Sequence, residues 1–147
     1  MVFVALILLM SVITLPWFKS ALPLPTDKAG LISSETPVKA TAFLLEQHPP
    51  GRIFNAMSFG SYLIWAAYPE YQVFADSRIE LFPVSVWQDY FSISNAEAGW
   101  EEKLTSYGVN SLMLNVSEQQ SLIEAVDSSN DWTAVYRDDT AAVYVRR

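Results

Sequence analysis

The chain contains no cysteine and a single histidine among its 147 residues. The absence of cysteine excludes disulfide bonds, thiolate catalysis and cysteine-ligated zinc. The single histidine, His48, has no fitting nucleophile beside it in the sequence, so a nucleophile activated by histidine is not indicated. We therefore expect neither a metal site nor a bound cofactor, and no catalytic residue can be identified from the sequence.

Basic residues are scarce relative to acidic ones. The chain has 9 lysines and arginines against 16 aspartates and glutamates, which gives a net charge of −7 at pH 7. Nucleic-acid binding requires clustered basic side chains that neutralise phosphates, and no such stripe is present. The same balance argues against tight docking on anionic lipid. We therefore expect no nucleic acid as a partner.

Charge is also missing from residues 1–18, which read MVFVALILLMSVITLPWF before the first charge at Lys19. A helix of this length spans about 27 Å, close to the roughly 30 Å hydrocarbon core of a bilayer. The sequence therefore predicts a transmembrane helix over residues 1–18, the lipid bilayer as a partner and a single-pass location in the cell membrane. A cleaved signal peptide, which normally starts with basic residues, and a buried core helix remain alternatives.

Residues 19–36 predict a linker, because Pro23, Pro25 and Gly30 interrupt regular structure. Residues 37–147 are sufficient for one domain with its own core. We expect its helices at residues 38–48, 58–68, 84–91, 94–107 and 121–129, strands at 52–55, 72–76 and 112–114, and a closing hairpin over 132–145. This order predicts an α/β fold, a small three-layer domain with a mixed, mainly parallel sheet and a C-terminal hairpin. The helix at 58–68 is apolar on nearly every face, so we expect it, with Trp65, to be buried.

Polar residues follow the apolar strands, and ligands of α/β sheets bind at the carboxyl ends of strands. Acidic and basic side chains alternate in residues 76–80, so in an extended segment they would project on one side. Free backbone N–H groups at the start of the helix 58–68 are able to hold an anion. The candidate ligand-binding residues are Asn55, Ser58, Gly60, Asp76, Arg78 and Glu80. A structural interpretation stays open, with the polar groups fixing turns and the glycine allowing close packing.

A longer pattern begins at residue 51. It comprises Asn55, the run Gly60-Ser61-Tyr62-Leu63-Ile64-Trp65, Pro69, Val73-Phe74-Ala75-Asp76-Ser77-Arg78, Glu80-Leu81-Phe82, Trp87-Gln88-Asp89-Tyr90, Trp100, Leu104, Tyr107-Gly108-Val109 and the closing hairpin. It resembles the C-terminal soluble domain that follows the last membrane helix in bacterial polytopic proteins similar to GT-C type glycosyltransferases, the dolichyl-phosphate-mannose protein mannosyltransferase class. The resemblance implies an extracytoplasmic domain that meets other membrane helices of a glycosyltransferase-like protein. The catalytic acid of that class lies in an early loop that has no counterpart here, so no catalytic residue is carried over.

Two functional hypotheses result. The first is a membrane-anchored, non-catalytic extracytoplasmic tail domain of a polytopic lipid-linked-sugar glycosyltransferase-like protein, or a remnant of one. The alternative is an independent single-span enzyme or a ligand-binding module, with a polar site at the strand ends around Asp76, Arg78 and Glu80.

Overall fold

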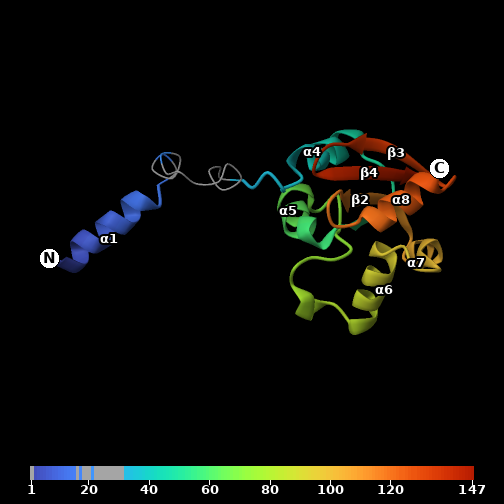
Figure 1. Cartoon of the computed structure of the whole chain (residues 1–147), viewed down its shortest axis with the longest axis horizontal. Coiled ribbons are helices and arrows are strands. Elements are labelled where there is room, and N and C mark those ends of the chain that lie inside the picture. Colours follow the sequence, from blue (N-terminus) through green and yellow to red (C-terminus); the bar gives the residue numbers. More distant parts are fainter. Residues whose placement is uncertain (1, 16, 18–20, 22–31) are drawn as a thin grey trace. The chain divides into compact units, whose positions relative to one another are not determined.

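A computed structural model of the chain describes residues 2–15, 17, 21 and 32–147 (Figure 1). Contacts within the chain divide it into two compact units, Met1–Thr36 and Pro37–Arg147, and each is described by itself. Most of the linker expected over residues 19–36 lies outside the described residues.

The first unit contains the helix α1, which extends over Val2–Ile13 and has 12 residues. Its end is closed by the N–H of Leu15, which donates to the carbonyl of Val12 in the tighter spacing typical of a final helical turn. Twelve residues span about 18 Å, well short of the roughly 30 Å hydrocarbon core. None of the helices in the described residues has both the length and the apolar character needed to cross a membrane. The transmembrane helix expected over residues 1–18 and the single-pass membrane location are therefore wrong.

The second unit is a mixed α/β domain. Its elements are α4 (Val38–Gln47), β1 (Arg52–Asn55), α5 (Met57–Ala67), the short 3-10 helix η1 (Ile79–Leu81), α6 (Val84–Ser94), α7 (Trp100–Ser106), β2 (Val109–Asn115), α8 (Gln120–Ser128), β3 (Trp132–Arg137) and β4 (Ala141–Arg146). The four strands form one sheet in the order β1-β2-β4-β3. Only β1 and β2 pair in parallel, whereas β2 with β4 and β3 with β4 are antiparallel. The mixed α/β class is confirmed, but the expectation of a mainly parallel sheet is wrong, because the closing hairpin contributes half of the strands.

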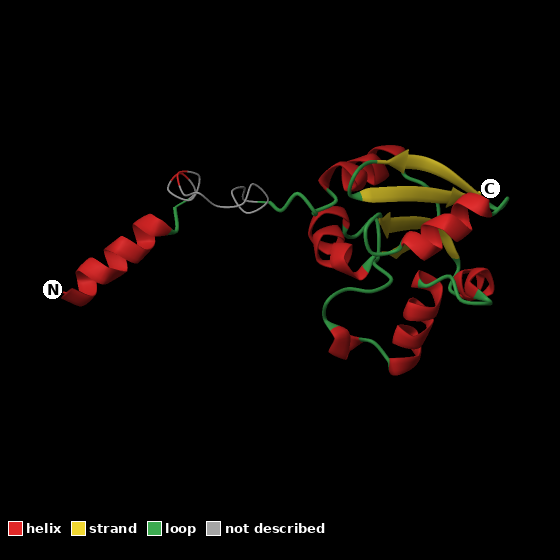
Figure 2. Cartoon of the chain, in the orientation of Figure 1, coloured by secondary structure: helices red, strands yellow, loops and turns green. Residues whose placement is uncertain are grey.

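Helices cover both faces of this sheet (Figure 2). Alternation along β2 sends Leu112 and Leu114 to one face and Met113 to the other. The first face packs against buried side chains of α6, α7 and α8, which include Trp87, Ile93, Leu104, Leu122 and Val126. The second face packs against α4 and α5 through Ala40, Leu44, Phe59, Leu63 and Ala67. The sheet is thus buried on both sides, as its nearly continuous apolar strands require.

Residues 72–76, expected as a strand, form an irregular segment in which Ala75 and Asp76 are nevertheless fully buried. Buried backbone groups need hydrogen-bond partners, and here the side chain of Asn55 supplies them. Its Oδ1 accepts from the N–H of Phe74 and its Nδ2 donates to the carbonyl of Ala75, both at 2.8 Å. A side-chain amide at the end of β1 therefore takes the place of a neighbouring strand.

The helix α5 is buried on one face only. Phe59, Leu63 and Ala67 recur every four residues and form its buried stripe. Trp65 lies on the opposite face with 77% of its surface exposed, next to the ring of Tyr62. The expectation that Trp65 is buried is therefore wrong, because α5 belongs to the outer layer and has solvent on its far side.

Candidate functional site

The carboxyl ends of β1 and β2 meet at a topological switch point. β1 continues into α5, which packs on one face of the sheet, and β2 continues into α8, which packs on the other. In open α/β sheets, adjacent parallel strands whose helices leave toward opposite faces form the crevice in which ligands bind. Asn55 and Asn115 are the last residues of the two strands, so this edge is where the sequence placed its candidate site.

The amide of Asn55 is fully used by the fold. Besides its two bonds to the segment 74–75, Nδ2 donates to the carbonyl of Ala56 at 2.8 Å. The residue is 0% exposed. Both amide hydrogens and the amide oxygen therefore have protein partners, and these bonds give Asn55 a structural role.

Gly60 brings the first turn of α5 against the segment 75–76. A Cβ atom at this position would lie 2.5 Å from the carbonyl oxygen of Ala75 and 2.6 Å from the Cβ of Asp76. Nearby, the hydroxyl oxygens of Ser61 and Ser77 lie 3.3 Å apart. The segment packs directly on the helix here, so Gly60 serves close packing.

Asp76 and Arg78 form a closed ion pair within the same loop. Oδ1 of Asp76 accepts from the backbone N–H of Arg78 at 2.8 Å and from its Nε at 2.9 Å, while Oδ2 accepts from Nη2 at 2.8 Å. The Asp76 side chain is 1% exposed, whereas that of Arg78 is 55% exposed. The side-chain hydrogen bonds from Arg78 lower the pKa of Asp76, although burial acts in the opposite direction. Asp76 is therefore a buried, ionised anchor for the loop.

Glu80 does not join this cluster. The 3-10 helix η1 begins at Ile79, so the extended alternation that would align Asp76, Arg78 and Glu80 ends before Glu80. Glu80 is exposed. The pKa of Arg78 is raised mainly by its hydrogen bonds to Asp76, and the charge of Glu80 makes only a smaller contribution. The structure thus separates an acid that the sequence pattern had grouped with the other two.

A second polar cluster joins the starts of α5 and α8 across the switch point. The Ser58 hydroxyl donates to Oε2 of Glu118 at 2.9 Å and accepts from Nδ2 of Asn115 at 3.3 Å. Oδ1 of Asn115 accepts from the backbone N–H groups of Ser117 and Glu118 and fixes the turn before α8. The candidate Ser58 therefore bonds to two residues that are absent from the expected site.

Buried hydrogen bonds extend this cluster to α6. The hydroxyl of Tyr90 accepts from the N–H of Met57 at 2.8 Å, and burial raises the pKa of Tyr90. Gln119 accepts from the N–H of Asn115 and donates to the hydroxyl of Ser94 at 2.9 Å. Glu118 and Gln119 carried a local signal, since they stand in a capping-box sequence. Ser94 also stood in a capping-box spacing and Tyr90 in the longer sequence pattern, but neither signal pointed to these partners, which lie far away in the chain.

These groups are arranged to hold the edge of the sheet together. Within residues 2–15 and 32–147, no three histidine, cysteine, aspartate or glutamate side chains come together in a way that would hold a metal ion. The buried carboxylate of Asp76 has a lowered pKa, so it is poorly suited to donate a proton at neutral pH.

No protein-family model matches the chain, and comparisons with curated proteins and with solved structures found no match either.

Proposed function

We propose that residues 37–147 serve as a non-catalytic accessory domain of a larger glycosyltransferase-like protein. One observation carries the non-catalytic part of this proposal: the polar groups at the switch point bind one another. Asp76 receives its hydrogen bonds from Arg78, Asn55 is saturated, and Ser58 bonds to Glu118. A general acid or base must instead reach the reacting group of a substrate with at least one free atom and a pKa near the working pH.

The link to glycosyltransferase-like proteins rests on the sequence resemblance alone. The residues that carry it have structural explanations in this fold. Gly60 allows the 75–76 segment to approach α5, and Asp76 with Arg78 fixes the loop that follows. A pattern of packing residues is what an accessory domain retains when the chemistry is carried out elsewhere in a protein.

One observation favours the alternative of a ligand site at the same loop. The side chain of Arg78 is 55% exposed although two of its guanidinium nitrogens bind Asp76. An exposed guanidinium fixed by a buried carboxylate is able to bind a phosphate. This alternative makes Arg78 a binding residue rather than only a partner of Asp76.

A paired measurement distinguishes the two proposals. Titration of a short-chain polyprenyl-phosphate sugar into the full chain and into Arg78→Ala, with thermal melts of both, separates binding from folding. For an accessory domain, we expect a lower melting temperature in Arg78→Ala, unchanged affinity for the probe and no sugar transfer to a serine-containing peptide. Arg52→Ala, another exposed arginine, is the control. Loss of probe binding with an unchanged melt would establish Arg78 as a binding residue, and sugar transfer abolished by Asp76→Asn would contradict the non-catalytic role.

A further inference from the structure

A cleft lies between α4 and the sheet, at the end away from the switch point. α4 ends at Gln47, where His48 adopts a left-handed conformation with φ 45° and donates its N–H to the carbonyl of Leu44. Two prolines follow, and proline cannot continue a helix. The chain therefore turns away before α4 covers the ends of the hairpin strands. The resulting cleft has a volume of about 580 Å³, and its apolar walls include Phe43, Pro49, Val135 and Val145.

Both irregularities in the register of the sheet place a residue in this cleft. Between β1 and β2, Arg52 pairs with Val109 and Ile53 with Ser111, so Asn110 is an extra residue. Between β3 and β4, the register is shifted between Ala134 and Tyr136, and Val135 is the extra residue. Asn110 and Val135 both line the cleft. Bulges of this kind redirect side chains and are enriched beside binding sites.

The side chain of Asn110 packs against the backbone of Gly51. Gly51 has φ +92°, and a Cβ atom there would lie 2.5 Å from Nδ2 of Asn110. The backbone of Gly51 therefore packs directly on the Asn110 side chain. A small number of polar groups among apolar side chains is the usual means by which a small-molecule site orients its ligand, and Asn110 supplies one of them here.

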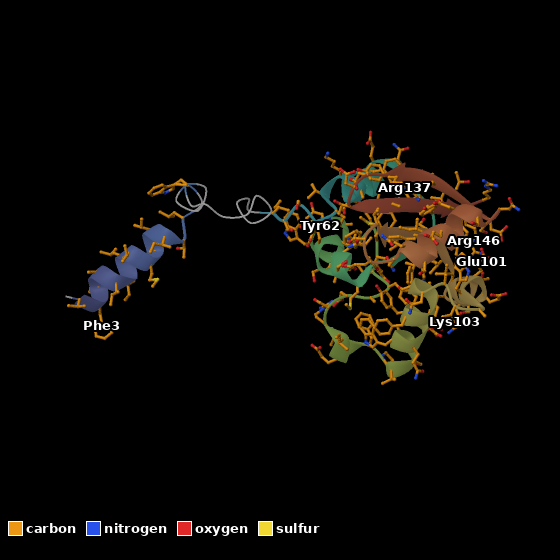
Figure 3. All side chains as sticks on the ribbon, in the orientation of Figure 1. Phe3, Tyr62, Glu101, Lys103, Arg137 and Arg146 are labelled. Atoms are coloured by element: carbon orange, nitrogen blue, oxygen red, sulfur yellow. The ribbon has the colours of Figure 1, made fainter. Side chains whose placement is uncertain are left out.

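The charge of the cleft is opposite to that of the chain. Acidic residues outnumber basic ones by 16 to 9 overall, yet the charged residues that line the cleft are Arg146 and Arg147. Arg146, labelled in Figure 3 at the far end of the domain from Tyr62, donates Nη1 to Thr105 and stacks its guanidinium 4.8 Å above the Trp132 ring centre. The bond to Thr105 uses Nη1 alone, and the buried Nε and Nη2 of Arg146 have no hydrogen-bond partner among the described residues.

Arg147 is the more exposed of the two arginines that line the cleft. Its N–H donates to the carbonyl of Asp131 and its Nε to the hydroxyl of Thr133, each at 2.9 Å. These bonds fix the residue beside the cleft, and neither of them uses the two terminal guanidinium nitrogens. Among the carboxylates of the described residues, none forms an ion pair with Arg147.

We propose that this cleft binds a small monocarboxylate with an apolar body. The body packs on Phe43 and Val145, and the carboxylate accepts hydrogen bonds from the terminal nitrogens of Arg147, with the amide of Asn110 as a further polar contact. The volume lies in the usual range for small-molecule sites, and a guanidinium binds a carboxylate through two parallel hydrogen bonds. This inference is independent of the accessory role proposed for the domain.

The test compares two probes of nearly equal shape, 2-naphthoate and the neutral 2-naphthalenemethanol, titrated into the full chain and followed by amide chemical shifts. We expect saturable binding of 2-naphthoate with a Kd below about 1 mM, and shifts at Asn110 and Val145. The alcohol should bind at least about tenfold more weakly. In Arg147→Gln the affinity for the carboxylate should fall about tenfold or more, while the affinity for the alcohol stays the same. Arg52→Gln is the matched control and should bind 2-naphthoate as the parent chain does.

A second set of variants tests the location. Val135→Trp fills the cleft and should weaken 2-naphthoate binding at least about tenfold, whereas Val84→Trp, at an exposed valine outside the cleft lining, should leave it unchanged. Gln47→Trp on the α4 side of the cleft replaces Val135→Trp if that variant does not fold. Equal affinity for the acid and the alcohol, or wild-type affinity in the cleft-filling variant, would overturn the proposal. Absence of saturable binding of both probes would overturn it as well.

Discussion

Gly60 and Asp76 approach so closely that a Cβ atom on Gly60 would lie 2.6 Å from the Cβ of Asp76. The contact joins the first turn of α5 to a loop whose next residues, Ser77 and Arg78, are exposed. On the other side of the same segment, Asn55 bonds to the backbone of residues 74 and 75. The loop is therefore held between the end of β1 and the start of α5, and its buried acid cannot move without disturbing both.

The close contact between Gly60 and Asp76 predicts that adding one methyl group at position 60 lowers the stability of the domain. Gly60→Ala should destabilise the domain by about 1–3 kcal/mol, because the added methyl overlaps with backbone atoms that cannot rotate away. Urea denaturation monitored by tryptophan fluorescence measures the change. Ser61→Ala, the next residue in α5, is exposed and should change stability by less than about 0.5 kcal/mol. Equal stability of Gly60→Ala and the parent chain would show that the loop does not rest on α5.

The ion pair of Asp76 predicts how stability depends on pH. Its pKa is lowered in the folded state, so its contribution is complete above the pKa of an unfolded aspartate, about 3.9, and is lost as the pH falls from there through the folded value. We expect Asp76→Asn to cost about 1.5 kcal/mol at pH 7, at the low end for a charged hydrogen bond because Arg78 is half exposed. Below pH 4 the variant should lose less further stability than the parent chain.

Thermal melts between pH 7 and pH 2.5 check this expectation. Asp139→Asn, in the exposed turn of the closing hairpin, is the control and should retain the acid sensitivity of the parent chain. Parallel loss of stability in Asp76→Asn and the parent chain over the whole acid range would refute a role of Asp76 in acid unfolding.

The two faces of α5 predict opposite outcomes for two neighbouring substitutions. Leu63 is 0% exposed and packs in the core between α5 and the sheet, so Leu63→Ala should cost about 2–5 kcal/mol. Trp65 is 77% exposed, so Trp65→Ala should change stability by less than about 0.5 kcal/mol in spite of its contact with Tyr62. Chemical denaturation followed by circular dichroism avoids dependence on the removed tryptophan. A larger loss at Trp65 than at Leu63 would mean that the buried face of α5 is assigned wrongly.

Local patterns in the sequence were sufficient for much of the secondary structure. Pro49-Pro50-Gly51 ends a helix and precedes β1, and the closing hairpin forms within one or two residues of its expected bounds. Asn115 stands after an apolar strand and fixes the turn before α8. In each case the interaction that decides the structure involves residues close together in the chain, so composition and spacing are sufficient to predict it.

The tertiary structure decided the features that depend on distant partners. Residues 72–76 have the composition of a strand, but the amide of Asn55, about twenty positions earlier, supplies the bonds that a strand would have provided. The exposure of Trp65 follows from the place of α5 in an outer layer, and the meeting of Asn110 and Val135 in one cleft follows from two separate bulges. Sequence patterns indicate which side chains are buried in a folded domain. The layer of each helix, the register of the strands and the partners of buried hydrogen bonds depend on how segments far apart in the chain pack together.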